Sequence, residues 1–404
     1  MGHNACQLLQ PQYYGFMKQH TKQRLLTPGP SPVPPEVLQE MAQPIIHHRT
    51  KQFRAIFGEL SRLLQKIFCT DGPVLSITGS GTTAFEATQV SLAEPGTKVI
   101  TVANGKFGER WQDIYDQYQF EQVRIELPWG QVPSAAQIQA TLEEHPDASV
   151  VTVVHSETST ATACDIQAIA QVVRHTDALL VVDGITSVGA IPIDMDDWGI
   201  DVVVSGSQKA LMLPPGLGYV ALGPRAVERL SQFKPVHAYN LDIRRWLTPW
   251  YAQDVPFTPP VSLIRGQRVA LEMIQHAGLR NTQQKTAQLA AATRAVLTAW
   301  GLKLVSKSPS DSVSGAFYPQ GIEDRPFRSI LRDVHGIHIA GGQDGRMAEW
   351  SGEIFRLSHM GYVNADDTLV ALNAIEKELI EHGCAIEKGS AQAVAGKHLN
   401  NLDR

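Results

Sequence analysis

The chain has 404 residues, of which 43% are hydrophobic and 19% are charged, and its formal net charge is -5. This length allows two domains, and the composition is that of a globular protein with a large core. A mildly acidic chain gives no reason to expect nucleic acid, which needs a clustered basic face. The longest apolar run covers a handful of residues and is too short to cross a membrane. We therefore expect a soluble protein that binds neither nucleic acid nor membrane.

The cysteines indicate a reducing, cytoplasmic setting. They lie far apart in the sequence and form no Cys-x-x-Cys pair: Cys6, Cys69, Cys164 and Cys384. Zinc and iron–sulfur sites use paired cysteines, and disulfide frameworks are denser in cysteine, so neither is indicated. The first 22 residues contain no continuous apolar stretch, so no signal peptide is expected.

From the middle of the first hundred residues to about residue 204, short β-branched runs alternate with helical patterns. The apolar runs expected to form strands are Val74–Thr78, Lys98–Val102, Val150–Val154, Leu179–Val182 and Val202–Val204. The helical stretches between them are Thr83–Leu92, Phe107–Tyr118, Ala135–Glu144 and Ile166–His175. Near-continuous apolar runs are typical of strands covered on both faces in a parallel sheet. The alternation predicts an α/β fold, with a mostly parallel sheet between layers of helices.

After about Val261 the pattern changes to that of a smaller α+β domain. Its expected elements are helices at Leu263–Gln275, Gln283–Ala299, Arg325–Val334 and Asp366–His382, and strands at Gly301–Val305 and Val313–Tyr318. We expect an N-terminal arm (1–24), a large domain (25–265), a small domain (266–385) and a flexible, polar tail (386–404).

The first candidate site is the segment Thr78–Thr83, which follows a strand and opens a helix. Its glycines let the backbone approach a ligand, and a helix start offers free N–H groups and the positive end of a dipole. Ser80 and Thr82 add hydroxyl groups. Together these features predict a phosphate cradle, although a glycine turn of this kind is more often structural when it stands alone.

Two further candidates are Asp183 and Lys209, which both follow buried strands. Alone, Asp183 is more simply a helix cap, and Lys209 a surface lysine. They lie about 26 residues apart, one βαβ step, so both can point into one crevice at the carboxyl ends of the strands. A strand-end aspartate can pair with a pyridine nitrogen, and a partly buried lysine is prepared to react with an aldehyde. With the phosphate cradle, these groups match the three anchors of pyridoxal phosphate.

A series of motifs then resembles one family. They are Leu26–Pro34 (LTPGPSPVP), Gly79–Thr82, Asn104–Trp111 (NGKFGERW), His155–Thr160, Asp183, Ser205–Lys209, Phe257–Val261 (FTPPV) and Phe355–Gly361 (FRLSHMG). The chain resembles the class-V, fold-type-I pyridoxal-phosphate aminotransferases, in the branch of the alanine–glyoxylate and serine–pyruvate enzymes. The resemblance covers roughly residues 25–382. Some relatives in this branch carry the label of a soluble hydrogenase small subunit.

The resemblance implies roles around the cofactor ring. Lys209 would hold the cofactor covalently and, once released by substrate, move the proton. Asp183 would pair with the ring nitrogen. Phe107 would stack on one face of the ring, Ile185 would cover the other, and Thr158 would lie by the ring hydroxyl. The groups that would hold the phosphate are Ser80, Gly81, Thr82 and Gln208.

The resemblance also implies the substrate side of the site. Arg356 would bind the substrate carboxylate, and the backbone at Gly29 would close over it. Thr258 would reach the phosphate of the other subunit, so the site would be completed only in a homodimer. Two positions depart from the family pattern. Val255 stands where many relatives have a tyrosine, which puts one phosphate hydrogen bond in doubt, whereas Ala161 replaces a glycine with little expected effect.

Other segments suggest weaker hypotheses. His47, His48 and Arg49 could meet a substrate side group near the entrance, but adjacent histidines make a poor metal site. His155 is equally a ligand-lining residue or a buried, hydrogen-bonded one. Glu157 lacks a carboxylate partner for acid–base work. The glycine-rich segment 340–345 is a turn, or a lid that moves with Arg356.

The expected function is therefore transfer of an amino group from alanine or serine to glyoxylate or pyruvate, by a ping-pong mechanism. One carboxylate-binding arginine and no obvious second cation favour small substrates. A cysteine desulfurase or related lyase is the first alternative, but such relatives have a histidine before the lysine, where Gln208 stands here. The second is a non-catalytic, hydrogenase-associated subunit, which would have no use for Asp183, Lys209 and Arg356 together.

Overall fold

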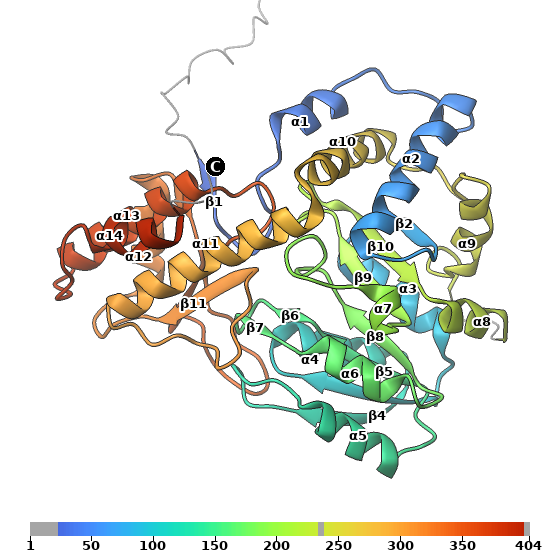
Figure 1. The fold of residues 1–404 in the computed structure, drawn as a ribbon. Coiled ribbons are helices and arrows are strands. Elements are labelled where there is room, and N and C mark those ends of the chain that lie inside the picture. Colours follow the sequence, from blue (N-terminus) through green and yellow to red (C-terminus); the bar gives the residue numbers. More distant parts are fainter. Residues whose placement is uncertain (1–22, 233–237, 400–404) are drawn as a thin grey trace, which may run out of the picture.

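A computed structural model of the chain describes residues 23–232 and 238–399. The described elements form a large sheet with helices on both faces, followed by a smaller α+β region (Figure 1). The helices are α1 (Pro35–Met41), α2 (Lys51–Phe68), α3 (Gly81–Leu92), α4 (Lys106–Gln117), α5 (Ala135–Glu144), α6 (Ile166–Val173), α7 (Met195–Trp198), α8 (Pro224–Gln232), α9 (Arg244–Tyr251), α10 (Val261–Ala277), α11 (Leu279–Ala299), α12 (Asp324–Asp333), α13 (Ala365–Glu381) and α14 (Ser390–Leu399). The fold class predicted from the sequence is confirmed.

The large sheet has seven strands in the order β2-β10-β9-β8-β5-β3-β4. They are β2 (Val74–Gly79), β3 (Lys98–Ala103), β4 (Glu121–Glu126), β5 (Val150–Val154), β8 (Leu179–Asp183), β9 (Val202–Gly206) and β10 (Gly216–Leu222). Only β10 runs antiparallel to its neighbours, β2 and β9. Because the other six strands point the same way, their carboxyl ends meet at one edge, where open α/β sheets bind ligands.

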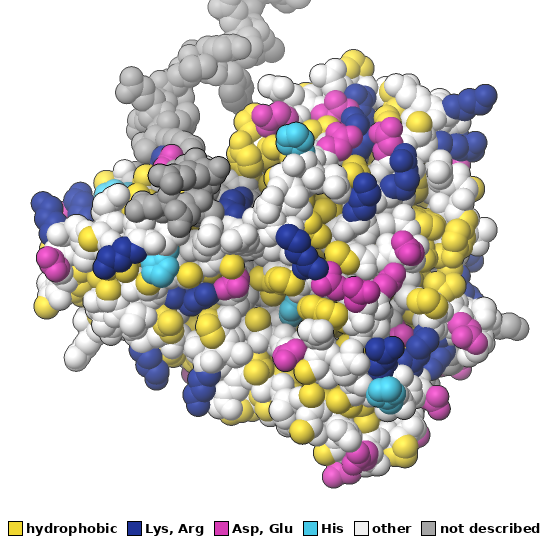
Figure 2. All heavy atoms as spheres, in the orientation of Figure 1, with side chains coloured by type: hydrophobic (Ala, Val, Ile, Leu, Met, Phe, Trp, Pro, Cys, Tyr) yellow, Lys and Arg dark blue, Asp and Glu magenta, His cyan; other side chains and the backbone are white. Residues whose placement is uncertain are grey.

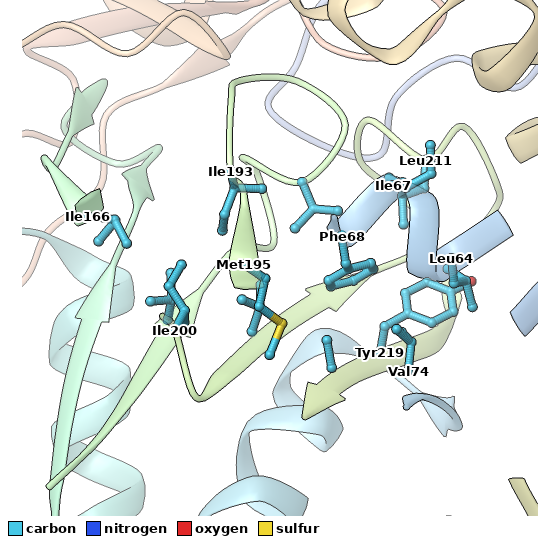
Figure 3. Packing of buried hydrophobic residues seen from close by; sticks show 14 of the residues in the cluster. Leu64, Ile67, Phe68, Val74, Ile166, Ile193, Met195, Ile200, Leu211 and Tyr219 are labelled. Atoms are coloured by element: carbon cyan, nitrogen blue, oxygen red, sulfur yellow. The ribbon is translucent and has the colours of Figure 1, made fainter. Parts of the chain in front are cut away.

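The inner strands of this sheet are buried on both faces, which explains their continuous apolar runs, whereas the edge strand β4 is polar and largely exposed. One face packs on α2, α6 and α10, and the other on α3 and α4. Figure 3 shows the first face, where Leu64, Ile67 and Phe68 of α2 lie over Tyr219 and Val74 of the sheet. Helix α2 begins at a cap, since Thr50 accepts a hydrogen bond from the N–H of Phe53 at 3.2 Å. The packing gives the strand ends a rigid support.

The smaller region has its own core, formed by α11, α12, α13, α14 and a three-stranded sheet. That sheet has the order β11-β14-β13, from β11 (Val313–Phe317), β13 (Ala340–Gly341) and β14 (Ile354–Ser358). The remaining strands are pairs of two residues each: β1 (Arg24–Leu25) with β12 (Ile337–His338), and β6 (Ser156–Glu157) with β7 (Thr162–Ala163). The strand expected at residues 301–305 does not form, and Leu304 makes only an isolated bridge to Ala316.

The two hydrophobic cores divide the chain at other places than the expected domain boundaries. Helix α10 lies in the first core with α2, and the second core takes its residues from α11 onward. By this criterion the change occurs near Gly278, between the two helices, and not between residues 265 and 266. Leu26 at the start of the chain belongs to the second core, because β1 pairs with β12. The expected arm lies mostly outside the described residues.

The expectation of a flexible tail over 386–404 is wrong for residues 390–399. These residues form α14, whose Ala391 and Ala395 are fully buried against the second core. The carboxylate of Glu376 in α13 accepts hydrogen bonds from the N–H groups of Gly389 and Ala391 and so caps the start of α14. Small alanine side chains allow this close packing, although the segment looks polar when read as composition.

None of the helices in the described part of the chain has the length and apolar character needed to span a bilayer. On the face that Figure 2 shows, lysine and arginine side chains lie among aspartate and glutamate side chains. The mixture of signs fits the small net charge of -5.

Candidate active site

A cavity of about 220 Å³ lies at the carboxyl ends of the parallel strands. The sequence predicted nine of its lining residues: Ser80, Gly81, Thr82, Phe107, Thr158, Asp183, Ile185, Gln208 and Lys209. They come from segments that follow β2, β3, β5, β8 and β9, so the parallel sheet brings together residues that are more than 120 positions apart.

The phosphate cradle predicted at residues 78–83 is the N-terminus of α3. Ser80 is the cap of this helix: its Oγ accepts from the N–H of Thr83 at 3.4 Å, and the hydroxyl of Thr83 accepts from the N–H of Ser80 at 3.1 Å. A Cβ on Gly81 would lie 2.2 Å from Cδ1 of Ile185, so a larger residue there would displace the Ile185 side chain. The buried Oε1 of Gln208, which also lines the cavity, has no hydrogen-bond partner in the described structure. This oxygen can accept a hydrogen bond from a donor in the cavity.

Asp183 ends β8 and is 4% exposed. Its carboxylate accepts hydrogen bonds from Nε1 of Trp111 at 3.3 Å and from the N–H of Ile185 at 2.9 Å. Burial raises the pKa of Asp183 to about 7, against the lowering effect of these donors and of Lys209. No lysine or arginine within the described ranges forms an ion pair with it, and a buried carboxylate of this kind is suited to a cationic partner.

Lys209 follows β9 and is partly buried in the same cavity. Its Nζ donates to the carbonyl oxygen of Pro28, and a Cβ on Gly29 would collide with the lysine side chain. Burial lowers the pKa of Lys209 to about 8; Asp183 opposes this, while Arg356 and Arg110 add to it. The amine is therefore uncharged in a far larger fraction than that of a surface lysine, as a nucleophilic lysine requires.

This pKa predicts how fast the cofactor-free protein captures pyridoxal phosphate at different pH values. Only the neutral amine attacks an aldehyde, so the rate should rise about tenfold per pH unit below pH 8 and flatten above it. Stopped-flow absorbance of the cofactor measures this rate. A rate that climbs without a break to pH 10 would show an unperturbed lysine.

Phe107 is held in place through Glu157, which is fully buried. Oε2 of Glu157 accepts from the N–H groups of Phe107 and Gly108 at 3.0 and 3.1 Å, and Oε1 accepts from the N–H and hydroxyl of Ser159. Helix α4 has no side-chain cap of its own at Gly105, so this carboxylate satisfies its first N–H groups. Burial raises the pKa of Glu157. Glu157 thus anchors the helix that carries the aromatic wall of the cavity.

Arg356 lies in β14 beside the cavity and is 5% exposed. Its guanidinium donates to backbone carbonyls: Nε and Nη2 to Gly341 at 3.0 and 2.7 Å, and Nη1 to Thr158 at 2.6 Å. Burial lowers its pKa to about 10, which leaves it charged at neutral pH. It forms no ion pair with an acidic side chain of the described residues, so the cation is available to a carboxylate ligand.

The structure does not bring Thr258 to this cavity. Thr258 is exposed in the segment between α9 and α10, and Val255 beside it is 2% exposed in the first core. Arg49 donates to Oδ1 of Asp254 at 2.9 Å and to the carbonyl of Val255 at 2.7 Å. Arg49 is thus engaged with the backbone of the segment that carries Thr258. The rings of His47 and His48 stack with centroids 4.9 Å apart.

Sequence reasoning missed three residues that line the cavity, Arg110, Ser156 and Thr186. Arg110 lies three positions after Phe107, and its guanidinium carbon is 4.8 Å from the centre of that ring. The helical spacing of 107 and 110 could have signalled it. His155 does not line the cavity; it is buried with a pKa lowered to about 4, and its Nδ1 has no partner in the described structure. His155 is thus buried outside the cavity, but the hydrogen bond expected for a buried histidine is absent at Nδ1 in the described structure.

Comparisons with known proteins define the class to which this fold and site belong. The model of the aminotransferase class-V family matches residues 24–369. The chain therefore belongs to the class-V aminotransferases, a family of pyridoxal-phosphate enzymes.

Particular relatives cover almost the whole chain. It is 36% identical over 375 residues to an uncharacterized aminotransferase of Methanocaldococcus jannaschii, covering 92% of this chain and 96% of the relative. It is 37% identical over 385 residues to a protein named soluble hydrogenase, small subunit, of Synechococcus sp. strain PCC 6716, covering 94% and 99%. It is 32% identical over 383 residues to the L-aspartate–glyoxylate aminotransferase of Paracoccus denitrificans, covering 93% and 95%. The crystal structure of an alanine–glyoxylate aminotransferase from Nostoc sp. superposes with a TM-score of 0.84 at 29% identity, covering 92% of this chain and 100% of that one.

The cavity fits pyridoxal phosphate on features of this chain alone. A buried carboxylate that forms no ion pair within the described residues and a desolvated lysine share this cavity with the N-terminus of α3 at Ser80 and Gly81. No group of His, Cys, Asp and Glu side chains that could hold a metal occurs in the described residues. The family and the cavity thus agree on the cofactor.

Proposed function

We propose that this aminotransferase moves the amino group of alanine or serine to glyoxylate or pyruvate by a ping-pong mechanism. The observation that carries the proposal is the shared cavity, in which Lys209 and Asp183 face one space and Arg356 lies alongside. The Nostoc and Paracoccus relatives, which are named for glyoxylate as acceptor, support this choice.

Pyridoxal phosphate, when bound, supplies an electron sink for the bond that breaks at the substrate carbon. Asp183 would hold the proton on the ring nitrogen, and that cation would in turn keep the carboxylate ionised. Lys209 would bind the cofactor covalently and later carry the proton on Nζ. Phe107 and Ile185 would orient the ring between them, and Gln208 with the N-terminus of α3 would hold the phosphate.

Arg356 is proposed to bind the α-carboxylate of every substrate. Arg356→Ala should raise the apparent Michaelis constants of donor and acceptor about 30-fold, because a charged hydrogen-bonded pair contributes about 2 kcal/mol. Steady-state kinetics with alanine and glyoxylate measures the change. Arg332→Ala is the control, because this exposed arginine of α12 pairs with its neighbour Asp333 outside the cavity. Unchanged constants would remove Arg356 from the site.

We further propose a homodimer in which Thr258 serves the partner's cofactor. Thr258 is exposed outside its own cavity; the ring of Tyr239, which is 67% exposed, lies 5.8 Å from that of the adjacent Phe257, and Tyr251 at the end of α9 is 63% exposed. Such a patch suits an interface with a second copy. Sedimentation of the purified protein tests the dimer. Thr258→Ala should weaken cofactor binding, and Val255 would leave this threonine without the neighbouring tyrosine hydroxyl of many relatives.

Arg110 supports a second candidate, an acidic amino donor such as aspartate. It is a cation on the cavity wall that forms no ion pair within the described residues, so the sequence-based expectation of a single cation at the site is incomplete. The Paracoccus relative is named for aspartate as donor. A distal carboxylate near Arg110 would gain a charged partner.

A panel of amino donors decides between these candidates. Alanine, serine, aspartate and glutamate would each be mixed with the purified protein, and the half-reaction followed in the visible spectrum of the cofactor. Rapid conversion by alanine or serine, reversed by glyoxylate or pyruvate, supports the proposal, and preference for aspartate supports the second candidate. Release of ammonia without an acceptor would indicate a lyase.

The remaining alternatives have weaker support. Cys384, the cysteine nearest the C-terminus, lies at the end of α13 in a separate hollow, and Gln208 precedes the lysine, which argues against a desulfurase. A hydrogenase-associated subunit would not need the cavity. We also propose a cytoplasmic location, in keeping with Cys69, Cys164 and Cys384 being free thiols.

A further inference from the structure

Residues 342–353 join β13 to β14. This segment leaves the small sheet and contacts helix α4, which packs on the large sheet. We call it the connecting segment. At its start, Gly341 supplies the carbonyl oxygen that accepts two hydrogen bonds from Arg356. At its end, β14 carries Arg356 itself. Contacts that hold this segment in place therefore also affect the position of Arg356 and of the Gly341 carbonyl that binds it.

One fixed point is Glu109 of α4, whose carboxylate is buried and 2% exposed. It accepts from the N–H of Arg346 at 3.0 and 2.9 Å, from the N–H of Met347 at 3.3 Å and from Nε1 of Trp129 at 3.3 Å. Hydrogen bonds to a charged acceptor are about twice as strong as neutral ones, and a buried carboxylate depends on them. The charge thus holds the backbone of the connecting segment on α4.

The second fixed point is the side chain of Arg346. Its guanidinium donates to Oε1 of Gln112, to Oδ1 of Asp113 and to the backbone carbonyl of Glu109, the last at 3.4 Å. A Cβ on Gly345 would lie 2.4 Å from Cζ2 of Trp129 and 2.6 Å from Oε2 of Glu109, so the backbone lies flush against the helix. The connecting segment therefore contacts two successive turns of α4, at Glu109 and at Gln112 and Asp113.

The same helix lines the cavity. Phe107 and Arg110 flank Glu109 on α4, and the first N–H groups of the helix are fixed by Glu157. Helix α4 is thus tied at one end to Glu157 of β6 and on its side to the connecting segment. Contacts therefore run without a break from Phe107 and Arg110 in the cavity, through Glu109 and the connecting segment, to Gly341, which binds Arg356.

We propose that Glu109 and Arg346 are positioning residues that set the place of Arg356 relative to the cavity. They touch no substrate; they act by holding the connecting segment, and through Gly341 the guanidinium, against α4. The inference rests on the proposed role of Arg356 as the carboxylate-binding group. Loss of either residue should weaken recognition of the substrate carboxylate and leave the cofactor in place.

Two reagents separate this effect from a general one. Hydroxylamine and aminooxyacetate both react with the aldehyde of the bound cofactor, but only aminooxyacetate carries a carboxylate for Arg356. The rate constant of each is measured from the cofactor absorbance for the wild-type holoenzyme and for Arg346→Ala, Glu109→Gln and Arg356→Ala. Arg332→Ala is the matched control, as an arginine of the same region outside these contacts. Hydrogen exchange of residues 342–353 reports the attachment itself.

Arg346→Ala and Glu109→Gln should slow aminooxyacetate about five- to tenfold, leave hydroxylamine unchanged and increase exchange in the connecting segment. Arg346→Lys, which keeps the charge near Asp113, should recover part of the loss. Equal slowing of both reagents, or increased exchange with no effect on aminooxyacetate, would overturn the proposal. If Arg356→Ala itself fails to discriminate between the reagents, the proposed function of Arg356 is wrong, and the inference falls with it.

Discussion

Lys209→Ala should lower the rate of amino transfer by about 1,000-fold or more, the largest effect expected of any single substitution. In the proposed function the side chain both holds the cofactor covalently and moves the proton; it lines the cavity, and its Nζ donates to the carbonyl of Pro28. Single-turnover kinetics with alanine gives the rate. The bound cofactor should also lose the absorbance that its bond to the lysine produces.

The control for this substitution is Lys106→Ala, which removes a lysine beside Phe107 that does not line the cavity. It should leave the rate near that of the wild type. Added methylamine should restore part of the activity of Lys209→Ala, since a small amine can carry the proton in the space that the side chain leaves. Absence of any loss in Lys209→Ala would refute the assignment.

Asp183→Asn should lower the turnover number on the order of 100-fold, the cost of removing one charge directed at a reacting system. The substitution keeps the shape of the side chain and leaves oxygen available to Trp111 or Ile185, so the fold should persist. What is lost is the negative charge that would keep the ring nitrogen protonated. Stopped-flow half-reactions measure the effect on the chemical step.

Asp201→Asn provides the comparison, because Asp201 is also 4% exposed but accepts from the N–H of Leu180 outside the cavity. It should reduce stability without changing the spectrum of the cofactor. If both substitutions changed turnover equally, the role of Asp183 would be structural only.

The site residues that lie directly at or after a strand could be predicted from the local sequence. Asp183 ends one continuous apolar run and Lys209 shortly follows the next, and a parallel sheet places such positions together without any further information. The glycines of residues 79–81 likewise signal a backbone that a ligand or neighbour approaches. Strand β10 escaped prediction because it begins in a Pro/Gly-rich segment, and its antiparallel direction is decided by pairing with β2 and β9.

The sequence could not show which side of a helix faces the cavity and which side packs on another segment. Arg110 and Glu109 are neighbours on α4, yet one faces the cavity and the other the connecting segment. Glu157 looked like a possible acid, but its environment makes it an acceptor for the start of α4. The packing of α14 depends on alanines that fit between helices, a property that composition alone does not carry.

Reduction of the holoprotein with borohydride, followed by digestion and mass analysis of the peptides, tests the central claim most directly. Borohydride makes the bond between cofactor and lysine permanent, so the site of attachment can be assigned to a residue. The account predicts the mass of the cofactor on Lys209 and on no other lysine. Labelling of Lys285, a second largely buried lysine whose pKa burial lowers, or of no lysine at all, would contradict it.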